Sequence, residues 1–172
     1  MHPSRQPFYV KEANNVLLAV FSDSHGATQP MIDAVARHKP DVALHLGDHD
    51  RDCDALREAF PQLDIRVVSG NCDPYSREPD RRIFELCGVK IFMTHGHLYN
   101  VKYGLDSLIN AAGFSGAKLA LFGHTHCARH FTVGSMDVLN PGAANRYGSF
   151  ALVELIRGTA QCKILSFGGN ES

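Results

Sequence analysis

The chain has 172 residues, 44% of them hydrophobic, which suits one domain with a core of its own. Lysine and arginine number 17 against 18 aspartate and glutamate residues, so the net charge of -1 gives no electrostatic reason to expect duplex nucleic acid or an anionic membrane as a partner. Five cysteines without a Cys-x-x-Cys pair argue against a disulfide framework and a thiolate zinc site, and they suit the reducing cytoplasm.

The N-terminal segment, residues 1–15, is polar and interrupted by proline. We read it as a short, potentially mobile arm. Residues 16–21, the longest early apolar run, are too few for a signal-peptide core or a membrane span.

Six short apolar runs, rich in β-branched and aromatic residues, are typical of strands. They comprise residues 16–21, 42–46, 65–69, 83–87, 90–94 and 118–122. Helical patterns occur at residues 29–39, 53–60 and 101–113. The βαβαβ opening predicts an α/β fold in which helices cover a largely parallel sheet.

After residue 128 the pattern changes to short strands joined by glycine turns. These runs comprise residues 128–133, 136–140, 149–158 and 159–167. A further hairpin is predicted around Cys87 and Gly88, whereas residues 71–82 read as a polar loop that interrupts the domain without dividing it. The strands suffice for two mixed sheets, and we predict a single domain over residues 1–172.

Polar residues follow five of the predicted strands at the point where each strand ends. The metal-ligand types among them are Asp23, His25, Asp48, Asn71, His95, His124 and His126. Because ligands in open α/β sheets bind outside the carboxyl ends of the strands, we expect these side chains to converge. His124 and His126 flank one threonine, so on an extended segment both rings would face the same side.

Each of these residues alone has a simpler interpretation. An aspartate could cap a helix or form a turn, Asn71 could be a turn residue, and His95 or His97 could be an ordinary interior histidine. Residues 122–130 could be a polar turn that is rich in histidine. Their joint occurrence at five strand ends favours a site. The histidines without such a context, which we read as structural, are His38, His45, His49 and His130.

The chemistry of this residue set points to metal ions. Aspartate, asparagine and histidine without thiolates supply the oxygen and nitrogen ligands that suit Mn, Fe, Zn or similar divalent ions. Seven side chains are too many for one ion and suit two ions about 3.5 to 4 Å apart with a bridging carboxylate. Four imidazoles disfavour Mg, so we expect two divalent ions, with Mn first and Ni, Zn or Fe as alternatives.

Six short motifs follow one another along the chain: DSHG (23–26), GD (47–48), GNCD (70–73), THGH (94–97), GHTH (123–126) and NPGA (140–143). In type and order they resemble the calcineurin-like metallophosphoesterases, and within them the small YfcE-like phosphodiesterases. The resemblance covers residues 16 to about 157. It implies a four-layer αββα sandwich of two mixed β-sheets flanked by helices, with a dinuclear site at one edge.

The resemblance also implies a role for each ligand-type residue. The first ion would be held by Asp23, His25 and His126. The second would be held by Asn71, His95 and His124, with Asp48 bridging the two.

The implied reaction is hydrolysis of a small phosphodiester by a metal-activated hydroxide, without a covalent enzyme intermediate. We count Asp48 and Asn71 as catalytic, together with His97, which we expect to donate a hydrogen bond to the substrate. Cys72 occupies the position where many superfamily members carry histidine, a proposed general acid, although cysteine is usual in the YfcE-like branch. Ala143 replaces a usual serine, so one hydroxyl is missing.

Two alternatives stay open. One is a phosphomonoesterase with the same centre. The other is a non-catalytic interaction scaffold, as in the retromer subunit of this fold, in which metal-binding positions are partly replaced. The Arg77, Arg81 and Arg82 cluster reads as a solvated loop, with the alternative that one arginine reaches a bound phosphate. The sequence does not exclude a homo-oligomer.

Overall fold

Two five-stranded β-sheets pack face to face in the computed structural model, which describes residues 15–168. The first sheet has the order β10-β9-β1-β2-β3. Its strands are β1 (Asn15–Phe21), β2 (Val42–His45), β3 (Asp64–Val67), β9 (Ser149–Ile156) and β10 (Thr159–Ser166). β1, β2 and β3 run parallel, whereas β9 pairs antiparallel with both β1 and β10.

The second sheet has the order β4-β5-β6-β8-β7. Its strands are β4 (Arg81–Leu86), β5 (Val89–Thr94), β6 (Leu119–Leu121), β7 (Arg129–Val133) and β8 (Met136–Asn140). β5, β6 and β8 run parallel, and the edge strands β4 and β7 are antiparallel to their neighbours. Both sheets are therefore mixed, as predicted.

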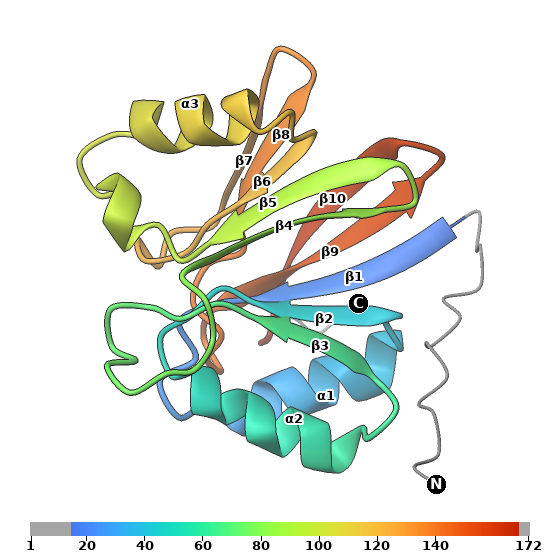
Figure 1. Cartoon of the computed structure of the whole chain (residues 1–172). Helices are drawn as coiled ribbons and strands as arrows, with labels where there is room; N and C mark the ends of the chain where they lie inside the picture. The colour runs from blue at the N-terminus through green and yellow to red at the C-terminus, as the bar shows by residue number, and fades with distance from the viewer. Residues whose placement is uncertain (1–14, 169–172) are drawn as a thin grey trace, which may run out of the picture.

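Helices cover the outer faces of both sheets (Figure 1). α1 (Thr28–His38) and α2 (Cys53–Ala59) lie on the first sheet, and α3 (Asp106–Phe114) lies on the second. Two short 3-10 helices, η1 (Asp50–Asp52) and η2 (His97–Tyr99), occur in loops. The order helices, sheet, sheet, helix confirms the predicted four-layer sandwich.

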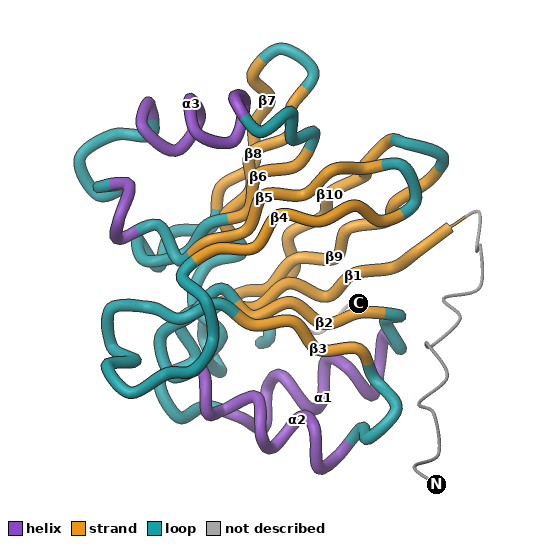
Figure 2. The backbone as a smooth tube through the Cα atoms, viewed as in Figure 1, coloured by secondary structure: helices purple, strands orange, loops and turns teal. Residues whose placement is uncertain are grey.

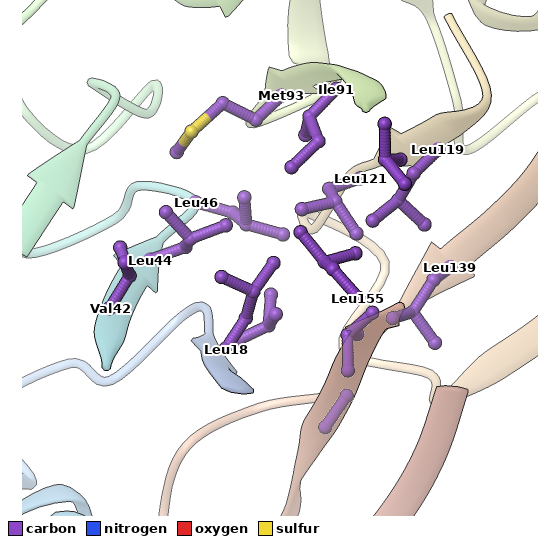
Figure 3. Packing of buried hydrophobic residues seen from close by; sticks show 14 of the residues in the cluster. Leu18, Val42, Leu44, Leu46, Ile91, Met93, Leu119, Leu121, Leu139 and Leu155 are labelled. Carbon is purple, nitrogen blue, oxygen red and sulfur yellow. The ribbon is translucent and has the colours of Figure 1, made fainter. Parts of the chain in front are cut away.

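The inner strands β1, β2, β5 and β6 bury both faces, which accounts for their continuous apolar runs. In β1, Leu18 and Val20 face the layer between the sheets, whereas Ala19 and Phe21 face the helices. The central layer consists mainly of leucine, isoleucine and valine from both sheets (Figure 3). A third apolar cluster lies between the second sheet and α3. Three apolar layers thus hold the four layers of structure together.

Two sequence predictions on elements need correction. The helix expected at residues 101–113 begins only at Asp106, because residues 101–105, which include Gly104, form turns. Arg81 and Arg82 belong to β4 and not to a loop, and Arg82 donates a hydrogen bond of 2.8 Å to the carbonyl of Val67.

Asn15, assigned to the N-terminal arm, begins β1, and the rest of that arm lies outside the described residues. Among residues 15–168, no helix combines the length and the apolar character needed to cross a membrane. All five cysteines are described, and none forms a disulfide.

Candidate metal centre

The loops that follow the parallel strands gather at one end of the sandwich (Figure 2). This end carries all seven ligand-type residues. Asp23 and His25 follow β1, Asp48 follows β2 and Asn71 follows β3. His95 follows β5, and His124 and His126 follow β6. The structure therefore brings side chains of both sheets to one place.

A first group consists of Asp23, His25, Asp48 and His126, whose ligand atoms all lie within 4.8 Å of one another. Nε2 of His126 is 3.1 Å from Oδ1 of Asp23, and Nε2 of His25 is 3.6 Å from Oδ2 of Asp48. The two carboxylates are buried, whereas both imidazoles are exposed. This arrangement is open to solvent on the histidine side.

A second group consists of Asp48, His95 and His124, again with ligand atoms within 4.8 Å of one another. Nε2 of His95 lies 3.1 Å from Nδ1 of His124 and 3.4 Å from Oδ1 of Asp48. Oδ1 of Asn71 lies 3.1 Å from the same His95 nitrogen. Asp48 is common to both groups.

The hydrogen bonds of His95 determine what its Nε2 can do. Its Nδ1 lies 2.8 Å from the carbonyl oxygen of Leu46, which can only accept, so Nδ1 carries the proton. In the neutral ring Nε2 then presents a lone pair. It faces oxygen atoms of Asn71 and Asp48 and a nitrogen of His124, all of them electron-rich. Such a cluster needs positive charge at its centre, supplied by a second proton or by a cation.

Asp23 provides a second test of whether a metal ion fits. Its Oδ2 accepts hydrogen bonds from Oγ of Ser22 at 2.6 Å and from the backbone N–H of His124 at 3.1 Å. Its Oδ1 is fully buried and accepts no hydrogen bond from any described residue, although His126 Nε2 lies close by. A buried carboxylate oxygen without a donor is costly, and a cation would satisfy it. The residues present fit a divalent ion.

The pKa values of the central pair reflect the same demand for positive charge. Burial alone would raise the pKa of Asp48, but hydrogen bonds from protonated His95 and from the backbone N–H of Cys72 outweigh burial and hold that pKa far below its ordinary value. Burial alone would lower the pKa of His95, but the hydrogen bond that its protonated ring donates to Asp48 and the charge of Asp23 outweigh burial and raise that pKa.

Backbone strain is concentrated at this site. Five of the seven ligand-type residues have left-handed backbones, with φ between 43° and 68°, namely Asp23, His25, Asp48, His124 and His126. This conformation costs a residue with a side chain about 1 to 2 kcal/mol. The surrounding structure holds these side chains in place against that cost.

Two glycines let the loops approach one another closely. A Cβ on Gly70 would collide with Oδ1 of Asp48, and a Cβ on Gly123 would collide with Oγ of Ser22. The loops after β3 and β6 can therefore reach the carboxylates only because these positions lack side chains.

Asp73 joins the loops after β2 and β3, a role that the sequence analysis missed. Its carboxylate accepts four backbone N–H groups, at 2.8 to 3.1 Å, from Asp48, His49, Asp50 and Gly70. This set of hydrogen bonds fixes the turn that carries Asp48. The motif GNCD was the available signal, but no spacing rule assigns its last residue to the neighbouring loop.

His45, read as structural, joins the loops after β1 and β2. Its Nδ1 accepts from the N–H of Gly47 at 3.2 Å, so in the neutral ring Nε2 carries the proton and donates to Oγ of Ser24 at 2.9 Å. Ser24 in turn donates to Asp52 at 2.7 Å. Burial lowers the pKa of His45 to about 4, so this chain of hydrogen bonds rests on a neutral imidazole.

Asn140, from the motif NPGA, supports the loop of His124 and His126. Its Nδ2 donates to the carbonyl of Gly123 at 3.1 Å and to Oγ1 of Thr125 at 2.9 Å. It is fully buried. Ala143, where a serine was expected, is 8% exposed and therefore hardly reaches the open surface of the site.

Three more residues lie next to ligand-type residues: His97, Cys72 and His49. The ring of His97 lies 5.4 Å from that of His95, and its Nδ1 is buried without a hydrogen-bond partner in the described chain. Burial, and then the charge of His95, lower the pKa of His97. Cys72 is exposed, and His49 places its ring 4.8 Å from that of His25.

Comparison with known proteins agrees with these features. The family model described as calcineurin-like phosphoesterase superfamily domain matches residues 16–157. A probable metallophosphoesterase of Bacillus subtilis is 32% identical over 165 residues, covering 91% of this chain and 94% of the relative.

Solved structures share the fold. A predicted phosphoesterase of Streptococcus pneumoniae has a TM-score of 0.74 at 30% identity, covering 89% of this chain and 90% of that chain. An archaeal phosphodiesterase has a TM-score of 0.69 at 19% identity, covering 87% and 99%. Zinc-bound Vps29 of Entamoeba histolytica has a TM-score of 0.69 at 22% identity, covering 88% and 99%. The last two, at such low identity, bear on the fold alone.

Proposed function

Because the chain belongs to the calcineurin-like phosphoesterase superfamily, we propose that it is a phosphodiesterase with a centre of two divalent metal ions. Family membership makes it a metal-dependent phosphoesterase. The preference for diesters, the two ions and the individual roles of the residues are the proposal. The observation that carries it is the position of Asp48, whose carboxylate takes part in both ligand groups.

In this proposal Asp23, His25 and His126 hold one ion. Asn71, His95 and His124 hold the other, and Asp48 bridges them. Two ions so placed would bind phosphoryl oxygens, lower the pKa of the attacking water and stabilise charge on the departing oxygen. Two observations support these assignments: Oδ1 of Asp23 is buried and accepts no hydrogen bond from the described residues, and Nε2 of neutral His95 presents a lone pair.

The residues around the centre position the substrate. His97 would donate a hydrogen bond to a phosphoryl oxygen, because its ring lies 5.4 Å from that of the ligand-type residue His95. The left-handed backbones of the ligand residues would keep their side chains oriented before the substrate arrives.

Manganese is the metal we propose, with Ni, Zn or Fe as alternatives. The groups contain four imidazoles, from His25, His95, His124 and His126, and ions that accept nitrogen ligands suit them better than Mg. The proposed setting is the cytoplasm, which suits five cysteines without a disulfide.

Two other functions use the same fold. A phosphomonoesterase would have the same centre. A scaffold without catalysis would need no complete ligand set, whereas this chain retains all seven ligand-type residues in two groups. The complete set therefore favours an enzyme.

The proposed function can be tested with protein that is purified without added metal. Metal content would be measured first, and hydrolysis of bis(4-nitrophenyl) phosphate and 4-nitrophenyl phosphate would then be compared with Mn, Ni, Zn and Mg. We expect two ions per chain and faster hydrolysis of the diester with Mn. Faster hydrolysis of the monoester would favour the phosphomonoesterase, and two bound ions without turnover of either ester would favour the scaffold.

A further inference from the structure

A groove beside the candidate metal centre has the size and lining of a small-molecule site. It has a volume of about 540 Å³, and ligand pockets typically measure about 300 to 1,000 Å³. It lies between the turns at residues 101–106 and the segment at residues 122–131. Its apolar lining residues are Val101, Leu105, Ile109, Phe122 and Phe131.

The groove adjoins the metal centre at two points. Thr125, which separates His124 from His126, forms part of its wall. Val101 packs against Gly96, which separates His95 from His97: a Cβ on Gly96 would lie 2.9 Å from Cγ2 of Val101. Residues of the groove wall therefore adjoin the segments that carry His95, His124 and His126.

Two cationic side chains line the groove. Lys102 and Arg129 are exposed, and neither forms an ion pair within residues 15–168. The guanidinium of Arg129 lies 4.6 Å from the centre of the Phe131 ring, an arrangement that leaves its N–H donors available. Asp106 supplies the one carboxylate in the lining. The side chains of the groove thus carry a net positive charge.

The lining also contains an aromatic residue, Tyr103, which follows Lys102 in the chain. Tyr103 lines the groove and is 93% exposed, so almost its whole ring is available to a ligand. Exposed aromatic rings stack on nucleobases with little dependence on which base is present. An apolar floor, an exposed ring and two cations together suit a ligand with a planar ring and an anionic group.

We propose that the groove binds one substituent of the phosphodiester substrate, and that this substituent is nucleotide-like: an aromatic base that stacks on Tyr103 and a second phosphate held by Lys102 and Arg129. This inference rests on the proposed function, because it takes the scissile phosphoryl group to lie at the metal centre. It names a substrate class that the ligand residues alone do not specify.

A matched pair of substrates tests the second phosphate. Thymidine 5′-(4-nitrophenyl phosphate) and its 3′-phosphorylated form have the same leaving group and the same base. We expect the 3′-phosphate to lower KM about tenfold in the wild type, because it gains charge-assisted hydrogen bonds. Lys102→Ala and Arg129→Ala should each remove most of this preference. Lys163→Ala removes an exposed lysine that lines none of the described pockets and serves as the matched control.

A binding measurement on metal-free protein separates this inference from the proposed function. Calorimetry in a chelating buffer would compare thymidine 3′,5′-bisphosphate, thymidine 5′-monophosphate and inorganic phosphate. We expect the bisphosphate to bind most tightly, with the advantage lost in Lys102→Ala, and we expect weaker binding in Tyr103→Ala than in Tyr103→Phe.

The outcomes are distinguishable. Equal KM for both diesters in the wild type, or a preference that survives in both Lys102→Ala and Arg129→Ala, would overturn the groove proposal and leave the phosphodiesterase intact. Binding of the bisphosphate that depends on Lys102, without hydrolysis of either diester under any metal, would instead overturn the proposed function.

Discussion

Asp48 is the residue on which both halves of the candidate centre depend. Its Oδ2 faces His25 of the first group, and its Oδ1 faces His95 of the second. The backbone N–H of Cys72 donates a hydrogen bond to the carboxylate of Asp48, and the carboxylate of Asp73 accepts one from the backbone N–H of Asp48. Together these bonds hold the Asp48 carboxylate in place. A change at Asp48 should therefore affect two ions at once, whereas a change at a peripheral ligand should affect one.

The first prediction compares two substitutions. Asp48→Asn should weaken both metal sites together, because a neutral amide bridges two cations poorly, and His25→Ala should mainly weaken one. Metal content after dialysis, measured by mass spectrometry, checks this difference. An Asp48→Asn protein that retained two tightly held ions and full turnover would show that the bridging assignment is wrong.

The second prediction concerns proton donation to the leaving group. Cys72 is exposed, and a thiol is a weak hydrogen-bond donor, so the site contains no evident acid at that position. A positioned acid is typically worth about 10²- to 10⁴-fold in rate. We therefore expect turnover to depend steeply on leaving-group acidity, with nitrophenyl diesters far faster than alkyl diesters.

His97→Asn serves as the comparison for this second prediction. A series of phosphodiesters with graded leaving groups would be hydrolysed by the wild type and by the variant. Steep dependence in both proteins is the expected result. Shallow dependence in the wild type that becomes steep in His97→Asn would instead identify His97 as the acid.

At the scale of elements, the apolar runs predicted every strand, and their number predicted two mixed sheets. The hairpin at Cys87 and Gly88 forms between β4 and β5 as predicted. A glycine between two apolar runs is a turn signal, and Gly88 has the positive φ that such a turn requires. The start of α3 was predicted five residues too early. The apolar spacing of residues 101–105 matches a helix, but these residues form turns that line the groove.

The loop supports could not be predicted in the same way. Asp73, His45 and Asn140 act through hydrogen bonds between loops that follow different strands. These hydrogen bonds depend on how closely the loops approach after the sheet has formed. No repeating pattern of residues along the sequence predicts them. The convergence of the seven ligand-type residues was predictable, because strand ends share an edge. Their ligand roles stay a prediction.

The third prediction follows from the neutral His45 between two of these loops. Its pKa in the folded protein is about 4, against 6.5 for the free side chain, so between these values the unfolded chain binds the extra proton. His45 should therefore stabilise the fold less as pH falls from neutral towards 4. We expect this residue to remove about 2 kcal/mol of unfolding free energy between pH 7 and pH 5.

Urea unfolding in a chelating buffer would measure this effect for the wild type and His45→Gln. Glutamine can still donate to Ser24 but does not titrate. The variant should lose less stability than the wild type between the two pH values. Equal losses in the two proteins would mean that His45 does not contribute to the pH dependence.

At the scale of the whole molecule, the ligand-type residues are divided between the two sheets. Asp23, His25, Asp48 and Asn71 come from the first sheet, and His95, His124 and His126 come from the second. The backbone of His124 bonds to Asp23 across 101 residues of sequence. Neither sheet alone contains a complete ligand group, so the apolar layer between the sheets must form before either proposed metal site exists.

If the proposed ions bind, this division predicts that they also change the folding kinetics. Contacts between the sheets that form late in folding are absent from an early transition state. A metal ion whose site needs these contacts should therefore slow unfolding and leave the folding rate unchanged. With Mn at about 100 times its dissociation constant, the gain of about 2.7 kcal/mol should appear as a roughly hundredfold slower unfolding rate. Stopped-flow measurements with and without Mn would check this, and a folding rate that rises with Mn would show that the site assembles before the rate-limiting step. An ion would then bind only after the sheets have docked and would leave before they separate. The lifetime of the folded state would therefore depend on the concentration of free metal.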